Sequence, residues 1–252
     1  MSSPQRSVVV TGGANGIGLA IARGFAAQGH RILLADVSDT VHNAAGKLST
    51  PQAPVHAHVA DVGEEAQVLG VAKRAIELFG GCDILVNCAG VSMKRDGKPI
   101  PPTEVRTGEW ERVLRINLTA PFLLSRDLLP GMRERKFGRI INIASRAGRT
   151  FVAPAGADYA SSKAGLIGLT RHLAGTYAPD GITVNCIAPG RIETALSSLS
   201  SPEIIAAAAK AIPVGRLGTT EEVASAAMFL ASDAASYVTG VCLDVNGGAF
   251  IA

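Results

Sequence analysis

A tyrosine and a lysine stand four residues apart in the segment Tyr159-Ala-Ser-Ser-Lys163. The apolar spacing that follows them predicts a helix near 158–178, so both side chains would lie on one helical face. A free tyrosine has a pKa of about 10, too high for a base at neutral pH, but a neighbouring ammonium group favours the phenolate and lowers that pKa. Tyr159 could then remove a proton from an alcohol or donate one to a carbonyl.

Two further polar residues could assist this chemistry. Ser145 follows the apolar run 139–143, where a hydroxyl at the end of a strand could hydrogen-bond a substrate oxygen. Asn117 lies within a long predicted helix over 108–135, and a buried amide there needs a partner, which suggests a role with water or backbone. Taken alone, the Tyr–Lys spacing is also compatible with an ordinary exposed pair on a helix.

A glycine-rich turn follows the first apolar run, 8–10, and precedes a helical apolar pattern. Its three spaced glycines are Gly12, Gly16 and Gly18. A helix N-terminus offers unpaired N–H groups and partial positive charge, and glycines let the backbone approach a ligand closely. This order of strand, glycine turn and helix predicts a pyrophosphate site.

Asp36 ends the second apolar run, 31–35, eighteen residues after Gly18. A carboxylate at that place can accept both hydroxyls of an adenosine ribose, whereas a 2′-phosphate beside it would place like charges together. The sequence therefore predicts NAD(H) as cofactor in preference to NADP(H). The plain alternative is an ordinary βαβ unit with a solvated aspartate.

Length and composition set the class of protein. The chain has 252 residues, 47% of them hydrophobic and 18% charged, with a formal net charge of +3. We expect one α/β domain over 1–252 with a substantial core. No block of Lys and Arg indicates nucleic acid, and neither a signal segment nor a membrane-length apolar run is present. A soluble cytoplasmic protein that binds neither nucleic acid nor membrane is the expectation.

Cysteines and histidines offer little chemistry of their own. The four cysteines show no C-x-x-C spacing, so we interpret them as reduced core residues: Cys82, Cys88, Cys186 and Cys242. His56 and His58 would share one face of a strand, but no cysteine or acidic partner accompanies them. No metal site is expected.

Short apolar runs alternate with longer amphipathic stretches along the chain. The predicted strands cover 8–10, 31–35, 55–59, 83–86, 139–143, 182–188 and 241–245, and the predicted helices lie near 38–48, 64–79, 108–135, 158–178 and 220–231. This alternation predicts a Rossmann-type, doubly wound parallel sheet of about seven strands in three α/β/α layers. Two segments interrupt it, 92–107 and 191–213, and we expect both to be loops bordering a ligand crevice.

In its motifs the chain resembles the short-chain dehydrogenase/reductase family over nearly its whole length. The matching motifs are Thr11-Gly-x-x-x-Gly-Ile-Gly18, Asp61-Val62, Asn87-Cys-Ala-Gly90, Asn117, Ser145, Tyr159-x-x-x-Lys163 and Pro189-Gly190. Their order and spacing are more specific than any one of them. Cys88 is a departure, because the family more often has asparagine there.

The resemblance implies a role for each matching residue. Tyr159 would be the acid/base, Lys163 would hold the nicotinamide ribose, Ser145 would position the substrate oxygen, and Asn117 would hold a water for a proton relay. The cofactor would be surrounded by Gly12, Asn15, Gly16, Ile17 and Gly18 at its phosphates, Asp61 and Val62 at its adenine, Asn87, Ala89 and Gly90 along the central strand, and Pro189, Gly190, Ile192 and Thr194 at its nicotinamide.

Function is then expected to be NAD(H)-dependent interconversion of a small secondary alcohol and a ketone. The C-terminal segment is also similar to 3-oxoacyl-carrier-protein reductases, which generally prefer NADP(H), but Asp36 favours a catabolic alcohol oxidation. A dinucleotide-sensing protein without turnover is a third class, disfavoured because all four catalytic residue types are present. The family also implies a homotetramer paired through the helices near 108–135 and 158–178.

Overall fold

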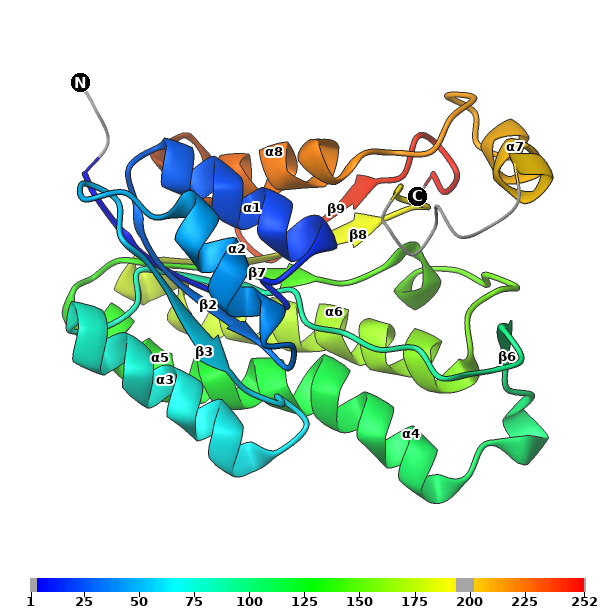
Figure 1. Cartoon of the computed structure of the whole chain (residues 1–252), viewed down its shortest axis with the longest axis horizontal. Coiled ribbons are helices and arrows are strands. Elements are labelled where there is room, and N and C mark those ends of the chain that lie inside the picture. Colours follow the sequence, from blue (N-terminus) through cyan, green and yellow to red (C-terminus); the bar gives the residue numbers. More distant parts are fainter. Residues whose placement is uncertain (1–3, 194–201, 252) are drawn as a thin grey trace.

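The computed structural model describes residues 4–193 and 202–251, whose main feature is a seven-stranded parallel sheet (Figure 1). Its strand order is β3-β2-β1-β4-β7-β8-β9. The strands are β1 Ser7–Thr11, β2 Arg31–Asp36, β3 Val55–Val59, β4 Ile84–Asn87, β7 Gly138–Ile143, β8 Ile182–Pro189 and β9 Cys242–Val245. The order reverses between β1 and β4, which is where such sheets open a crevice at their carboxyl ends.

Helices cover both faces of the sheet, so the predicted three-layer, doubly wound fold is confirmed (Figure 1). One face carries α1 Gly16–Ala27, α2 Thr40–Leu48 and α8 Thr220–Ala231, and the other carries α3 Glu65–Phe79, α5 Ala120–Glu134 and α6 Ala157–Tyr177. Each face has its own apolar core, because the strands are buried on both sides and alternate residues point to opposite layers. Val8 and Val10 belong to the first core, and Val9 belongs to the second.

The predicted helix over 108–135 is in fact three consecutive pieces. Helix α4 covers Thr107–Leu114, a π-helical turn covers Arg115–Thr119, and α5 begins at Ala120. In the π-helical turn the Ala120 amide donates to the Arg115 carbonyl, five residues back. Pro121 has no N–H, so the Asn117 carbonyl cannot receive the usual α-helical bond from it. The break therefore falls at Asn117.

The two interrupting segments carry structure that the sequence did not predict. Segment 92–107 contains the small antiparallel hairpin of β5 Lys94–Arg95 and β6 Lys98–Pro99, followed by a 3-10 turn at Pro102–Glu104. Segment 191–213 contains α7 Pro202–Lys210. The hairpin and α7 both lie at the carboxyl ends of the strands (Figure 1).

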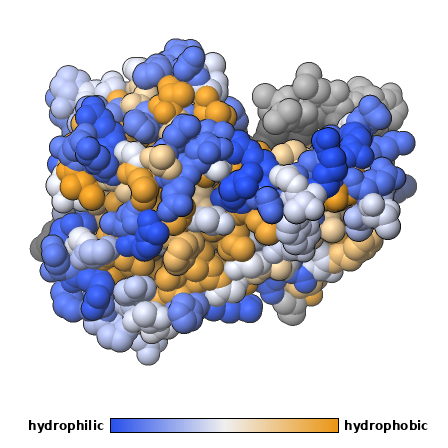
Figure 2. Space-filling model, turned by 90° about the horizontal axis from the view of Figure 1, so that it is seen from below, coloured by the Kyte–Doolittle hydropathy of each residue, from blue (hydrophilic) through white to orange (hydrophobic). Residues whose placement is uncertain are grey.

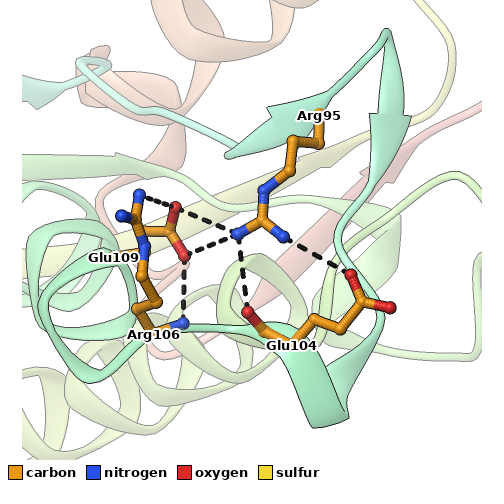
Figure 3. A network of polar contacts seen from close by, with 4 residues as sticks. All are labelled: Arg95, Glu104, Arg106 and Glu109. Atoms are coloured by element: carbon orange, nitrogen blue, oxygen red, sulfur yellow. Dashed lines mark hydrogen bonds and ion pairs between the residues drawn. The ribbon is translucent and has the colours of Figure 1, made fainter.

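A network of charged side chains ties the hairpin to the start of α4 (Figure 3). The Arg95 guanidinium contacts the Glu104 carboxylate at 3.4 Å and the Glu109 carboxylate at 3.2 Å. Glu109 also accepts hydrogen bonds from the Arg106 side chain and backbone. These contacts hold segment 92–107 against the start of α4.

Candidate active site

The carboxyl ends of β1, β2, β4, β7 and β8 border a cavity of about 750 Å³. This volume lies within the range of about 300–1,000 Å³ that is usual for ligand pockets. The cavity is lined by every residue predicted for the site except Asn87, Asn117 and Thr194: Gly12, Asn15, Gly16, Ile17, Gly18, Asp36, Asp61, Val62, Ala89, Gly90, Ser145, Tyr159, Lys163, Pro189, Gly190 and Ile192. Thr194 lies outside the described residues.

The glycine turn packs so closely that side chains are excluded from it. Gly12 has a φ of +67°, and a Cβ there would lie 2.9 Å from the Ala89 nitrogen. A Cβ on Gly18 would overlap the Gly12 carbonyl. The Thr11 hydroxyl accepts hydrogen bonds from the Cys88 and Ala89 amides, each at 3.1 Å, and so joins the turn to the end of β4. Glycine at positions 12 and 18 therefore allows the turn to pack against the end of β4 and against itself.

Asp36 organises the same end of the cavity through both carboxylate oxygens. Its Oδ2 accepts from the Ala14 amide at 3.0 Å and its Oδ1 accepts from the Ser38 amide at 3.0 Å. A carboxylate has about four acceptor positions, so both oxygens keep capacity for ribose hydroxyls. Asp36 lies beside the glycine turn, as the sequence predicts. It also holds the Ala14 and Ser38 amides, which the sequence did not reveal.

Tyr159, Ser145 and Lys163 meet at the end of β7. Ser145 and Tyr159 both line the cavity there, and the Ser145 Oγ accepts a hydrogen bond from the Ala147 amide at 3.1 Å. The Lys163 Nζ lies 5.7 Å from the centre of the Tyr159 ring and donates to the Ile143 carbonyl at 2.7 Å. Lys163 is only 3% exposed, so its ammonium group is held inside the protein beside the phenol.

The sequence predicts that Lys163 lowers the pKa of Tyr159, but among the protein's own groups burial has the largest effect and raises that pKa. Burial raises the pKa of the Tyr159 hydroxyl, and the polar Ser145 side chain offsets only part of that rise. Burial also lowers the pKa of Lys163 to about 8, because the charged ammonium loses its hydration. As the pH rises, Lys163 therefore loses its proton before Tyr159 does.

Asn117 lies behind the cavity wall and joins two segments that border it. Its Nδ2 donates to the Val91 carbonyl at 2.9 Å and to the Ser162 hydroxyl at 3.0 Å, while its Oδ1 accepts from the Val91 amide at 2.8 Å. Ser162 in turn donates to the Tyr159 carbonyl at 2.7 Å. The predicted need of this buried amide for polar partners is confirmed, and the partners are backbone and a hydroxyl.

Asn87 is also buried beneath the cavity. Its Nδ2 donates to Asn142 Oδ1 at 2.8 Å, and Asn142 donates onward to the Thr170 hydroxyl at 2.9 Å. Asn87 Oδ1 has no hydrogen-bond partner among the residues that the structure describes. Asn87 therefore supports the end of β4 from within the sheet.

The sequence pattern did not indicate Arg112 as a residue of the cavity wall. Arg112 lines the cavity from α4 and pairs with Asp61, which is 51 residues away in the chain. The periodicity around Arg112 indicates only an amphipathic helix, and no local pattern reveals a partner so distant in sequence.

Known proteins are similar to this chain over nearly its whole length. A family model described as enoyl-(acyl carrier protein) reductase matches residues 12–249. A Sinorhizobium fredii protein named an uncharacterized short-chain type dehydrogenase/reductase is 35% identical over 257 residues, 98% of each chain. The chain belongs to the short-chain dehydrogenase/reductase family. As a member of this family it is an oxidoreductase that acts on CH–OH or C=O groups with a nicotinamide cofactor.

Two solved structures of this family are close to the whole chain. A 3-oxoacyl-[acyl-carrier protein] reductase of Brucella melitensis with bound NAD has a TM-score of 0.90 and 37% identity, covering 100% of this chain and 93% of that one. A Beutenbergia cavernae protein, named as a candidate NAD(P)-dependent gluconate 5-dehydrogenase with NADP at low occupancy, has a TM-score of 0.90 and 38% identity, with 98% coverage of both chains.

The residues present fit a pyridine dinucleotide. Gly12, Gly16 and Gly18 line the cavity at the start of α1, where helix amide groups can bind a pyrophosphate, and Asp36 lines it beside them. Such a cofactor, when bound, supplies or accepts a hydride at the carbinol carbon. Within residues 4–193 and 202–251, no three His, Cys, Asp or Glu side chains gather as metal ligands, and no helix has the length and apolar character needed to cross a membrane.

Proposed function

We propose that this short-chain dehydrogenase/reductase interconverts a secondary alcohol and a ketone, with Tyr159 as the acid/base. The observation that carries the proposal is the meeting of Tyr159, Ser145 and Lys163 on the wall of the cavity that also holds the glycine turn. In the direction of reduction, Tyr159 donates its proton to the carbonyl oxygen as the hydride arrives. Ser145 hydrogen-bonds that oxygen, and the Lys163 ammonium stabilises the phenolate that remains.

For the substrate, we propose the 3-ketone of a 3-oxoacyl thioester. The sequence alone favoured a catabolic alcohol, with the thioester as an alternative, and the Brucella relative supports the alternative. Val91 and Ile192 line the same cavity as Ser145 and offer apolar surface to an acyl chain.

For the cofactor, we propose a preference for NAD(H). Asp36 already binds two backbone amides and remains an anionic acceptor, so the 2′-phosphate of NADP(H) would meet a fixed negative charge. The NAD in the Brucella structure is compatible with this preference, while the Beutenbergia protein was found with NADP.

A substrate panel followed by NADH and NADPH absorbance tests the proposal. The panel contains 3-oxoacyl thioesters, sugars, polyols and hydroxy acids, each with both cofactors. We expect the highest kcat/KM with a 3-oxoacyl thioester and NADH. Binding of NADH without turnover of any ketone or alcohol would instead favour a dinucleotide-sensing protein.

A further inference from the structure

Arg112 forms a contact that links α4 to the loop after β3. Its Nη2 donates to Asp61 Oδ2 at 2.5 Å, and its Nη1 lies 3.6 Å from Glu64 Oε1. The Arg112 and Asp61 side chains are 29% and 26% exposed, whereas that of Glu64 is 61% exposed. Asp61 is thus the main partner, since a half-exposed pair at longer distance contributes little.

The chain makes room for this contact. A Cβ at Gly63 would overlap the Arg112 guanidinium, so a side chain at this position would displace the guanidinium from the place it takes here. The Gly63 amide also donates to Asp61 Oδ1 at 2.8 Å. One oxygen of Asp61 is therefore held by backbone and the other by Arg112, which fixes the plane of the carboxylate.

The fixed carboxylate remains an acceptor. Burial raises the pKa of Asp61, but the hydrogen bonds from Arg112 and Gly63 outweigh it and hold the pKa below its usual value. Each oxygen has one protein donor and a second lone pair. Asp61 can thus accept one more hydrogen bond from a ligand in a defined direction.

Arg112 and Asp61 line the cavity with Val37, Ala60 and Val62, which follow β2 and β3, whereas Ser145 follows β7 on the other side of β1 and β4. If the proposed dinucleotide lies over the glycine turn with its ribose at Asp36, its base reaches these residues. Adenine presents an exocyclic amino donor at its edge, which a carboxylate accepts, whereas hypoxanthine presents an oxygen there. A planar guanidinium also offers a surface on which a purine can stack.

We propose that Arg112 is a positioning and specificity residue for the base of the cofactor: it orients the Asp61 carboxylate to select adenine. This inference rests on the proposed dinucleotide-dependent function and adds a residue to it. It requires that Arg112 act on the adenosine half alone, with no part in hydride or proton transfer.

Calorimetric binding to Arg112→Met tests the proposal. The ligands are AMP, ADP-ribose, NADH, the hypoxanthine analogue of NADH, and reduced nicotinamide mononucleotide. We expect the dissociation constants of the three adenine ligands to rise about tenfold, the effect of losing roughly one charged hydrogen bond. The mononucleotide should bind the variant and the wild type equally, and the wild-type preference for adenine over hypoxanthine should shrink.

The matched control is Arg115→Met. Arg115 lies three residues further along, is 48% exposed and pairs with Glu111 at 3.7 Å, and it is not part of the cavity wall. This variant should bind all five ligands like the wild type. Arg112→Lys keeps the charge without the planar fork and should fall between the wild type and Arg112→Met; it also serves if the Met variant does not fold.

Two outcomes would overturn the proposal. One is unchanged AMP and NADH binding in both Arg112 variants. The other is an equal loss for the adenine and hypoxanthine forms, which would mean that Asp61 is not oriented for the base. A wild-type protein that binds no pyridine nucleotide at all would instead refute the proposed function.

Discussion

Tyr159 is buried among groups that make its phenol harder to ionise, so its hydroxyl is a proton donor at neutral pH. We expect Tyr159→Phe to lower kcat by about 10²-fold or more, because the variant keeps the aromatic ring but lacks the hydroxyl that donates the proton. NADH affinity, measured by fluorescence titration, should stay nearly unchanged. Tyr177→Phe, on the same helix but outside the cavity wall, is the control. An active Tyr159→Phe enzyme would remove the acid/base assignment.

Burial of Lys163 predicts that the unfolding free energy of the protein depends on pH. Its pKa is about 8 in the folded protein and 10.5 in the unfolded reference, because burial disfavours the ammonium. Between those two values the unfolded chain binds more protons, so Lys163 destabilises the fold fully below pH 8 and progressively less above it.

The measurement is urea unfolding of the wild type and Lys163→Met at pH 7 and pH 9.5. Relative to the variant, the wild type should gain about 2 kcal/mol in unfolding free energy over this interval. All other titrating groups are the same in both proteins, so their contributions cancel in the difference between the two unfolding free energies. A difference that stays constant with pH would show that Lys163 keeps its proton in the folded state throughout.

Asp36 carries the prediction on cofactor choice. Asp36→Ala should raise kcat/KM with NADPH relative to NADH, because the charge opposing a 2′-phosphate is gone. The same variant should also bind NADH more weakly than the wild type, since Ala14 and Ser38 lose their common acceptor. Asp39→Ala removes an exposed charge from the same loop and should leave the ratio unchanged. Equal use of both cofactors by the wild type would contradict the preference.

At the scale of elements, local patterns were sufficient wherever an element is defined by its own periodicity. The strands and the helices near 64–79, 158–178 and 220–231 follow from alternation and helical spacing, and the order of motifs placed most of the cavity wall. The π-helical turn at Asn117 was not predicted, because one proline changes the hydrogen-bond pattern without changing the apolar period. The hairpin and Arg112 depend on partners distant in sequence.

Segment 92–107 is anchored at both ends by contacts of different kinds. At one end, buried Asn117 makes two hydrogen bonds to the Val91 backbone, and at the other, exposed Arg95 pairs with Glu104 and Glu109 (Figure 3). Asn117→Ala leaves buried polar groups without partners and should cost about 2–3 kcal/mol. Arg95→Ala should cost less than about 1 kcal/mol, because exposed ion pairs are screened.

Chemical unfolding of the two variants at low and high salt separates these contributions. The cost of Arg95→Ala should shrink as salt is added, and that of Asn117→Ala should not. Asn117→Ala should also lower kcat, since Asn117 holds Ser162, which in turn bonds the Tyr159 carbonyl. Equal costs for the two variants would contradict the assignment of the buried anchor as the stronger one.

In the whole molecule the cavity lies at the carboxyl ends of the strands, and apolar side chains are exposed on an outer face. Figure 2 shows such side chains gathered on the side below the sheet, where α3, α5 and α6 lie. Phe122 on α5 is 44% exposed. Ala164, Gly168 and Gly175 are exposed small residues of α6, and the exposed Arg171 lies on the same helical face between the two glycines. The exposed apolar side chains on this face give the family expectation of two-fold pairing a physical basis.

We therefore expect a homotetramer in solution, paired across α5 and α6. Light scattering at micromolar concentration should give four times the 25.9 kDa of one chain. Gly168→Arg and Phe122→Arg each place a long charged side chain where two copies would meet, and should reduce the mass to a dimer or monomer. Ile76→Arg makes the same change at a 49% exposed residue of α3 and should leave the tetramer intact. A wild-type protein of one-chain mass would refute the pairing, and equal dissociation by all three variants would place the contact elsewhere.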